Sequence, residues 1–278
     1  RNISYIRNAV KVTIDAYDGT TKFYIADNSD PVIKTLDKIY PNLFLPMEKM
    51  PDDIRNHIRY PKGLFTVQAM QYATYHMTDP QVFYNREDLW EIPNETYDST
   101  TQMMKPYYLV TKLPGDEKES FVLMIPFAPT NKDNMIGWMA VKCDPDEYGE
   151  FVVFKLPKDR TVYGPMQIES RIDQDTDISQ KLTLWGQVGS RVIRGNLMII
   201  PIEDSLLYVE PIYLQAEQSE LPELKRVILS YGDQVVMGKN LTTVIDDVFS
   251  EEVQKEVVKI INIDSNEDLN LMQNLFQS

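Results

Sequence analysis

The sequence has little cysteine and little histidine. Its 278 residues include one cysteine, Cys143, and two histidines, His57 and His76. A single thiol cannot form an intramolecular disulfide, and three such side chains leave little for a closed zinc site. We therefore expect neither a disulfide framework nor a zinc centre, and we predict no bound cofactor.

Long apolar runs are also missing. The most apolar stretch, SFVLMIPFAP at residues 120–129, is short and contains two prolines, whereas a membrane-spanning helix needs about 20 consecutive apolar residues. We expect that this segment does not itself span a membrane. The chain starts with RNISYIRNAV and shows no signal peptide, which favours a piece of a longer protein.

Positive charge is scarce as well. The chain has 28 Lys and Arg against 42 Asp and Glu, a formal net charge of -14. Phosphate binding requires clustered Lys and Arg, so the composition excludes a broad nucleic-acid or anionic-membrane surface. Divalent cations and basic protein surfaces are the partners that this charge favours.

The hydrophobic pattern predicts both strands and helices. Alternation around the Asp18-Gly19 turn predicts a β-hairpin over residues 10–25, and the runs over residues 106–129 and 135–157 predict two more. Proline-punctuated segments over residues 30–77 predict a block of short helices, one of which carries a stripe of core residues that ends at His76. This stripe consists of Phe65, Ala69, Tyr72, Ala73 and His76.

The second half repeats this mixture. Residues 163–190 predict two short helices that meet near 173–177, three or four strands follow over residues 190–238, and LTTVIDDVFS at 241–250 predicts a closing helix. Runs of helices separated from runs of strands indicate an α+β fold, with antiparallel sheets of hairpins and a separate block of short helices. We predict one domain over 1–250, with subdomains 1–103 and 104–250 as an alternative, and an acidic helical or loosely ordered tail over 251–278.

The segment YHMTDPQVFYNREDLWEIP, residues 75–93, is the strongest candidate for an acid–base site. A histidine paired with a carboxylate can act as a general base. The simpler interpretation is that His76 continues the buried stripe of its helix, and that Asp79 and Pro80 begin the next helix as N-cap and first residue. If a catalytic site exists here, its candidates are His76, Asp79, Tyr84, Arg86 and Glu87.

Asp173, Asp175 and Asp177 have the opening spacing of a calcium loop. The rest of that motif is missing, because Ile178 stands where a glycine is needed and Leu184 where a bidentate glutamate is needed. We interpret Asp177 as the N-cap of the following helix, with the other two acids near the same helix start. A divalent-cation site at these three residues is retained as an alternative.

Several long stretches resemble a known family. They are YATYHMTDPQVFYNREDLW, DNMIGWMAVKCD, LPELKRVILSYGD and the segment from YGPMQIESRIDQD through LYVEPIYLQAE. Together these stretches are similar to uncharacterised protein family 0182, over most of residues 5 to 250. The resemblance implies a large bacterial or archaeal protein with several transmembrane helices, followed by a soluble region on the outer face of the cell membrane, of which this chain would be the C-terminal section.

The resemblance brings no catalytic residues, and G-x-S-x-G, H-E-x-x-H and G-x-G-x-x-G motifs are missing from the sequence. The leading hypothesis is a non-catalytic extracytoplasmic domain that serves in binding or assembly. Its partners would be the membrane-embedded remainder of its own chain, and envelope proteins or divalent cations. The alternatives are a cell-envelope hydrolase or transferase with a site around His76, and a divalent-cation-responsive module.

Overall fold

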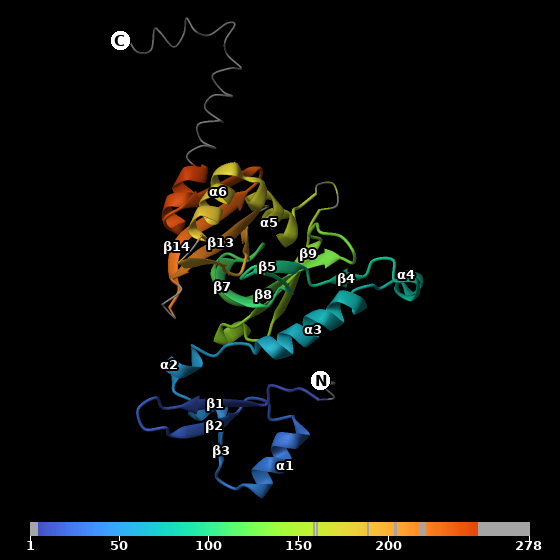
Figure 1. Ribbon diagram of the computed structural model, residues 1–278. Coiled ribbons are helices and arrows are strands. Elements are labelled where there is room, and N and C mark those ends of the chain that lie inside the picture. Colours follow the sequence, from blue (N-terminus) through green and yellow to red (C-terminus); the bar gives the residue numbers. More distant parts are fainter. Residues whose placement is uncertain are drawn as a thin grey trace, which may run out of the picture. The chain divides into compact units, whose positions relative to one another are not determined.

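The computed structural model describes residues 5–157, 159, 161–187, 189–202, 205–216 and 221–249. These residues form helices and mostly antiparallel sheets, so the predicted α+β fold is confirmed. The chain divides into two compact units (Figure 1). Unit 1 comprises Arg1–Pro93 and Met104–Val162, and unit 2 comprises Asn94–Met103 and Tyr163–Ser278.

Unit 1 begins with a small three-stranded sheet. The predicted hairpin forms as β1 (Val10–Ile14) paired antiparallel to β2 (Thr21–Ile25), and β3 (Phe44–Pro46) joins β2 in parallel. Helix α1 (Pro31–Ile39) separates β2 from β3, and Asp30 caps it by accepting hydrogen bonds from the backbone N–H groups of Val32 and Ile33.

The helical block of unit 1 follows. Its remaining helical elements are η1 (Met47–Lys49), α2 (Asp52–Arg55), α3 (Lys62–Tyr75) and α4 (Pro80–Asn85), and β4 (Trp90–Glu91) comes after them. The predicted stripe of α3 is confirmed, because Phe65, Ala69 and Ala73 are buried in it. Helix α3 contacts β4 and β8, so its stripe forms one side of the unit 1 core.

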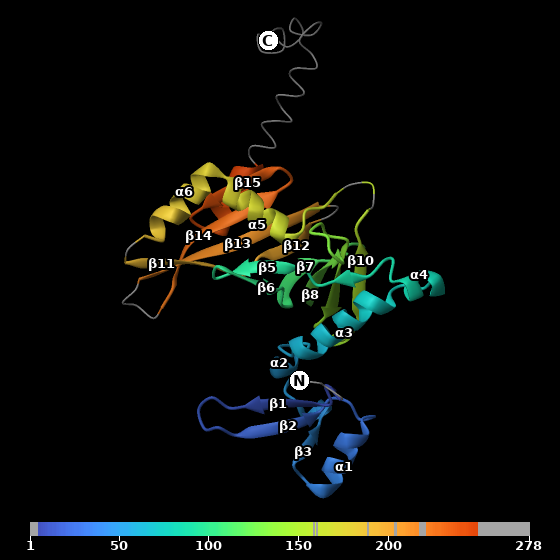
Figure 2. The same cartoon turned by 45° about the vertical axis from the view of Figure 1, so that its right-hand side comes forward.

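The second sheet of unit 1 is built around β8 (Glu119–Pro129), as Figures 1 and 2 show. One edge of β8 pairs with β9 (Gly137–Lys142), which continues into β10 (Phe151–Lys155) across the short helix η2 (Pro145–Glu147). The other edge is shared by β7 (Tyr107–Lys112) and then by β4. Both predicted hairpins over 106–129 and 135–157 are therefore confirmed.

Unit 2 repeats this use of one long central strand. β13 (Ser205–Ala216) pairs along one edge with β12 (Met198–Ile202) and β11 (Ser190–Arg194), and along the other with β14 (Glu223–Tyr231), which pairs with β15 (Gln234–Gly238). The hairpin of β5 (Asn94–Tyr97) and β6 (Thr100–Met103) also belongs to this unit. Helix 241–249 packs on the sheet through Val244 and Val248.

The two helices predicted between residues 163 and 190 are α5 (Pro165–Gln174) and α6 (Thr176–Trp185). One detail of the prediction was wrong. Asp175, and not Asp177, is the N-cap of α6, and its carboxylate accepts the hydrogen bond of the Ile178 N–H at 2.9 Å. Asp177 lies two residues after this cap, in the first turn of the helix.

The boundaries of the units differ from the subdivision at residue 103. Residues 94–103 were placed with the first subdomain on the basis of chain order, but in the structure they form the β5–β6 hairpin of unit 2. Residues 104–162, placed with the second subdomain, complete unit 1. The predicted tail at 251–278 lies outside the described residues.

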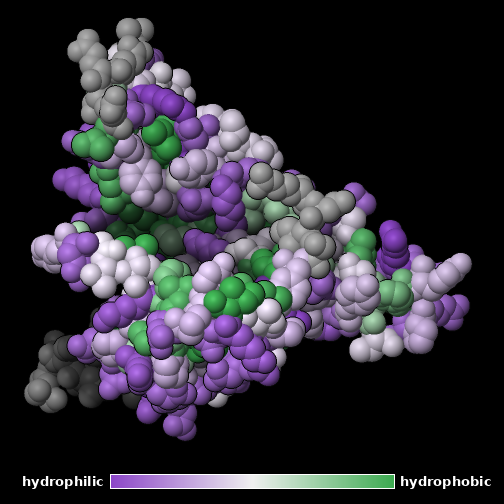
Figure 3. All heavy atoms as spheres, turned by 90° about the horizontal axis from the view of Figure 1, so that it is seen from below, coloured by the Kyte–Doolittle hydropathy of each residue, from purple (hydrophilic) through white to green (hydrophobic). Residues whose placement is uncertain are grey.

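The molecular surface is mainly hydrophilic on the face that Figure 3 presents, where hydrophobic residues occupy separate areas between polar ones. Exposed apolar side chains include Ile14 and Tyr17 in the first hairpin. Scattered apolar side chains of this kind are normal on protein surfaces. Within the described residues, no helix has both the length and the apolar character needed to cross a bilayer.

Candidate functional site

A polar cavity of about 500 Å³ opens on unit 1 where three segments meet. These segments are residues 86–89 after α4, residues 129–136 after β8, and Leu156, Pro157 and Thr161 after β10. We call this cavity the polar pocket. Its lining residues are Arg86, Glu87, Asp88, Leu89, Pro129, Thr130, Asn131, Lys132, Asn134, Met135, Ile136, Leu156, Pro157 and Thr161.

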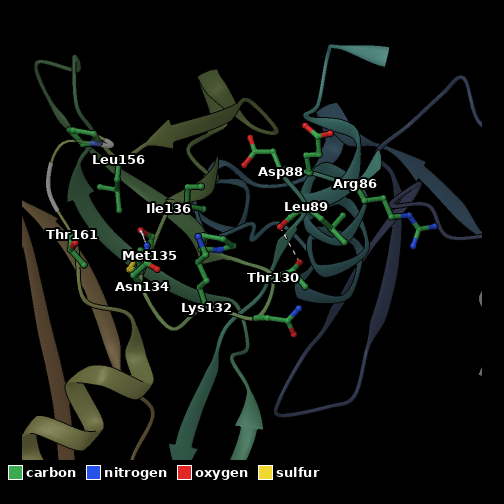
Figure 4. Close-up of a pocket in the computed structure, with 14 residues that line it drawn as sticks. Arg86, Asp88, Leu89, Thr130, Lys132, Asn134, Met135, Ile136, Leu156 and Thr161 are labelled. Carbon is green, nitrogen blue, oxygen red and sulfur yellow. Dashed lines mark hydrogen bonds between the residues drawn. The ribbon is translucent and has the colours of Figure 1, made fainter. Parts of the chain in front are cut away.

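The end of β8 positions the central part of the lining. β8 stops at Pro129, and the Lys132 N–H donates to the Pro129 carbonyl at 3.0 Å, which closes a turn with Asn131 at a positive φ of 61°. The Thr130 hydroxyl and backbone N–H both donate to the Leu89 carbonyl, at 3.0 and 2.9 Å (Figure 4). These bonds join the turn after β8 to the segment before β4.

The opposite wall begins where α4 ends. Arg86 has a left-handed backbone (φ 55°), which terminates the helix and redirects the chain into residues 87–89. In Figure 4 the guanidinium of Arg86 extends away from the other labelled side chains, so Arg86 forms the edge of the polar pocket. Glu87 is held by a hydrogen bond that Asn85 Nδ2 donates to its Oε1 at 2.8 Å.

Asp88 connects the polar pocket to the interior. Its Oδ1 accepts a hydrogen bond from Trp90 Nε1 at 3.3 Å, and its Oδ2 lies 3.6 Å from His76 Nε2. The imidazole of His76 is 2% exposed, stacks on Trp90 at 3.9 Å between ring centroids, and contacts the Tyr72 carbonyl through Nδ1 at 3.1 Å. With Nδ1–H donating to that carbonyl, the buried Nε2 has no hydrogen-bond partner among the described residues.

The structure separates the five residues suggested as a catalytic site. Asp79 caps α4 by accepting from the Gln81 and Val82 N–H groups, as predicted, and Tyr84 is 87% exposed. Glu87 and Arg86 line the polar pocket, while the imidazole of His76 is enclosed behind it. The carboxylate that faces His76 is therefore Asp88 and not Asp79, the acid that lies nearer in sequence.

The three aspartates proposed for calcium have separate roles. Asp175 caps α6, Asp177 lies in the first turn of that helix, and Asp173 accepts a hydrogen bond from Arg194 Nη1 at 2.6 Å. Nowhere in the described ranges do three or more His, Cys, Asp or Glu side chains form a group that could hold a metal ion. The geometry therefore gives no support to a calcium loop at this position.

Asp173 leads to a buried ionic cluster that sequence reasoning missed. Arg194 in β11 donates from Nε and Nη2 to the two carboxylate oxygens of Glu210 at 2.6 and 2.9 Å, and its Nη2 also donates to Glu169 of α5. Glu169 and Glu210 are both buried. We call Arg194, Glu169, Asp173 and Glu210 the Arg194 cluster; it ties α5 to the sheet of unit 2.

The Arg194 cluster holds more acids than cations. Burial, followed by the nearby charge of Glu210, raises the pKa of Glu169 to about 8. Burial raises the pKa of Glu210 as well, although the hydrogen bonds of Arg194 oppose this effect. Both buried carboxyl groups therefore favour the protonated form more than an exposed glutamate does, and they share one arginine. A charged residue inside an apolar strand, as in SRVIR and LLYVEPI, was the available signal for this cluster.

Sequence comparison identifies the relatives of this chain. The model of an uncharacterised protein family, UPF0182, matches residues 1–185. The chain belongs to UPF0182. A UPF0182 protein of Methanospirillum hungatei JF-1 is 56% identical over 93% of this chain, and one of Pelotomaculum thermopropionicum is 56% identical over 95% of it. A UPF0182 protein of Trichodesmium erythraeum is 54% identical over 93% of the chain.

The chain spans about 29% of the length of the first two of these UPF0182 relatives and 28% of the third. No solved structure matches it. The family resemblance noted from the sequence is thus confirmed. The relatives indicate no site residues, so the residues of the polar pocket are identified from the geometry of unit 1 alone.

Proposed function

We propose that this UPF0182 segment is a non-catalytic binding domain, and that the polar pocket of unit 1 is where it engages its partner. The observation that carries the proposal is the mixture of charges on one lining, with Glu87 and Asp88 on one wall and Lys132 and Asn134 on another. Such a lining fits a peptide segment that carries both signs of charge, because each wall can pair with the opposite charge.

The proposal of a binding role, rather than catalysis, rests on the position of His76. A general base must reach the proton that it abstracts, but the imidazole is 2% exposed and is covered by Trp90 and Asp88. The thiol of Cys143 is also buried, and burial raises its pKa, which makes it a weaker nucleophile at neutral pH.

The cellular setting of the proposal comes from the family resemblance. The chain covers less than a third of the length of these relatives, so we infer that most of the intact protein lies outside this segment. We infer that the remainder includes the transmembrane helices and that this segment lies on the outer face of the cell membrane. An epitope tag in the exposed loop around Gly19 tests the location: the tag should be accessible to antibody on intact cells, and a tag accessible only after lysis would contradict it.

The binding role is tested by titrating the chain with a blocked Lys-Glu dipeptide, acetylated at one end and amidated at the other. We expect saturable shifts in the amide NMR signals of Asn131 and Lys132, and no such shifts with a blocked Ala-Ala dipeptide. Asp88→Asn and Lys132→Met should each weaken binding about two- to fivefold, the effect of losing one solvent-accessible ion pair. Lys105→Met and Asp37→Asn alter exposed charges outside the lining and should leave the affinity unchanged.

A second function is favoured by one observation. Asp88 touches both the polar pocket and His76, so a proton could be relayed between Asp88 and the imidazole in a cell-envelope hydrolase or transferase. A panel of peptide, glycan and phosphoester substrates distinguishes the two functions. Turnover that disappears in His76→Ala while the circular dichroism spectrum stays unchanged would replace the binding role with catalysis.

A further inference from the structure

A second cavity of unit 1, of about 290 Å³, is lined by residues that the proposed function does not use. We call it the Lys11 pocket. Its lining residues are Lys11, Ala26, Met47, Glu48, Arg55, Ile58, Cys143, Pro145 and Tyr148. Most of this lining is apolar, in contrast to the polar pocket.

Lys11 is the unusual member of this lining. Its Nζ donates to the hydroxyl of Tyr148 at 2.6 Å and to the carbonyl of Arg59 at 3.3 Å, and it lies 4.9 Å from the centre of the Tyr148 ring. Both hydrogen-bond acceptors are neutral. Among the described residues, no carboxylate comes within ion-pair distance of Lys11, so the ammonium forms no ion pair there.

The environment of Lys11 lowers the pKa of its ammonium group. Burial lowers the pKa of Lys11 to about 8, because a desolvated ammonium without a counter-charge is unstable. An ammonium group has three N–H donors, and two are used by Tyr148 and Arg59. Within the described part of the chain, the third donor has no hydrogen-bond partner and could hold a ligand.

Arg55 adds a second incompletely satisfied cation to the same lining. Its Nη2 donates to the carbonyls of Met47 and Met50, and its Nη1 lies 3.7 Å from the exposed carboxylate of Asp52. Its Nε is buried and has no hydrogen-bond partner among the described residues. A buried donor of this kind is rare in folded proteins, and it usually marks a place where a water or a ligand binds.

We propose that the Lys11 pocket binds a small organic carboxylate with a short apolar chain, whose carboxylate pairs with Lys11 Nζ. A monoanion matches the charge of the ammonium, while Glu48 in the lining would repel a doubly charged phosphate more strongly than a monoanion. The side chains of Ala26, Met47, Ile58 and Pro145 would contact the apolar chain. The volume equals that of about ten water molecules, which suits a ligand of this size.

Hexanoate is a suitable probe, and the methyl group of Met47 is a suitable reporter. In a titration of the whole 278-residue chain with ¹³C-methyl-labelled methionine, we expect the Met47 signal, assigned with Met47→Leu, to shift saturably. The signal of Met237, which lies in unit 2, should stay fixed. Methyl hexanoate has the same apolar chain without the charge and should bind at least about tenfold more weakly, because charge-assisted hydrogen bonds are the strong ones.

The matched variants are Lys11→Met, which keeps the apolar stem and removes the charge, and Lys22→Met, which changes an exposed lysine on the neighbouring strand. We expect Lys11→Met to weaken hexanoate binding at least about tenfold and Lys22→Met to leave it unchanged. The proposal is overturned if hexanoate gives no saturable shift, or if methyl hexanoate binds the wild-type chain as tightly as hexanoate does. The ester comparison needs no variant, so it stands even if Lys11→Met does not fold.

Discussion

Arg194 of unit 2 is buried and Lys11 of unit 1 is half-buried, and their partners differ. Arg194 contacts the three carboxylates of Glu169, Asp173 and Glu210, whereas Lys11, among the described residues, hydrogen-bonds to a tyrosine hydroxyl and a backbone carbonyl and to no carboxylate. Burying a charge is costly unless it is paired. Unit 2 thus uses the Arg194 cluster to hold its own helix and sheet together. Unit 1 also has one paired buried cation, Lys142, which contacts Asp116 and Glu147, but its Lys11 faces a cavity.

This difference assigns separate roles to the two units. The Arg194 cluster should affect the stability of unit 2 and leave ligand binding unaffected. The polar pocket and the Lys11 pocket should affect binding more than stability, because their charged groups face cavities. Variants on either side test this comparison.

The largest effect is expected at the centre of the Arg194 cluster. Arg194→Met leaves Glu210 and Glu169 buried without their cation, and breaking a buried pair in this way costs about 3–5 kcal/mol. The matched control is Arg191→Met on the same strand, because Arg191 is 59% exposed in its ion pair with Asp98 and such pairs contribute about 0–1 kcal/mol. Urea denaturation of both variants measures the difference, and equal losses would show that the Arg194 cluster does not stabilise unit 2.

The second effect concerns pH. Since the pKa of Glu169 is about 8 in the folded chain and 4.5 is its ordinary value, the folded state binds more protons between these limits. The free energy of unfolding therefore falls as the pH rises from about 4.5 to about 8, by an amount on the order of a few kcal/mol, because one pKa unit corresponds to about 1.4 kcal/mol.

Glu169→Gln is the variant for this prediction, because glutamine resembles the protonated acid and cannot ionise. Its unfolding free energy should change less between pH 6 and pH 9 than that of the wild-type chain. Asp98→Asn, which neutralises an acid of the exposed pair in the same unit, is the control and should retain the wild-type slope. An identical slope in Glu169→Gln would mean that another group titrates.

A smaller effect is expected at His76. His76→Ala removes the ring that stacks on Trp90 and leaves Asp88 without the imidazole beside it, which should destabilise unit 1 by about 1–3 kcal/mol. His57→Ala, which removes a histidine from an exposed turn, should cost only a few tenths of a kcal/mol. Thermal denaturation compares the two. If His76→Ala proved as stable as His57→Ala, the imidazole would have no architectural role.

The smallest effect distinguishes two aspartates of α6. Asp175→Ala removes the N-cap and should cost about 1 kcal/mol, whereas Asp177→Ala removes a charge from the first turn and should cost about 0.3–1 kcal/mol in low salt and less in high salt. Denaturation in high salt separates them best, because the hydrogen bond of the cap persists when charge effects are screened. If Asp177→Ala lost more stability than Asp175→Ala in high salt, Asp177 would be the N-cap, as the sequence suggested.

Periodicity was sufficient for the elements with a clear apolar pattern. The hairpins β1–β2, β7–β8 and β9–β10 and the stripe of α3 were predicted from sequence because local alternation reports which face is buried. The β5–β6 hairpin was missed because NETYDSTTQM is mostly polar. Its stability comes from unit 2, where buried Glu95 accepts hydrogen bonds from Asn196 Nδ2 and the Leu197 N–H.

The candidate site was predicted less well, because it depends on contacts between distant segments. The sequence paired His76 with Asp79, three residues away, but the chain turns at Arg86 and brings Asp88 back to the imidazole. Lys132 joins the same pocket because β4 pairs with the end of β8 and Thr130 donates to the carbonyl of Leu89, 41 residues away. Local spacing contains no information about a contact of this range.

The most direct test of the comparison is one NMR titration that observes both units at once. The blocked Lys-Glu dipeptide is added to the labelled chain, and the signals of the Asn131 and Lys132 amides and of the Arg194 Nε–H group are followed together. The account predicts saturable shifts at Asn131 and Lys132, while the Arg194 signal stays fixed in its bond to Glu210. Shifts at Arg194, with none at the two pocket amides, would contradict it.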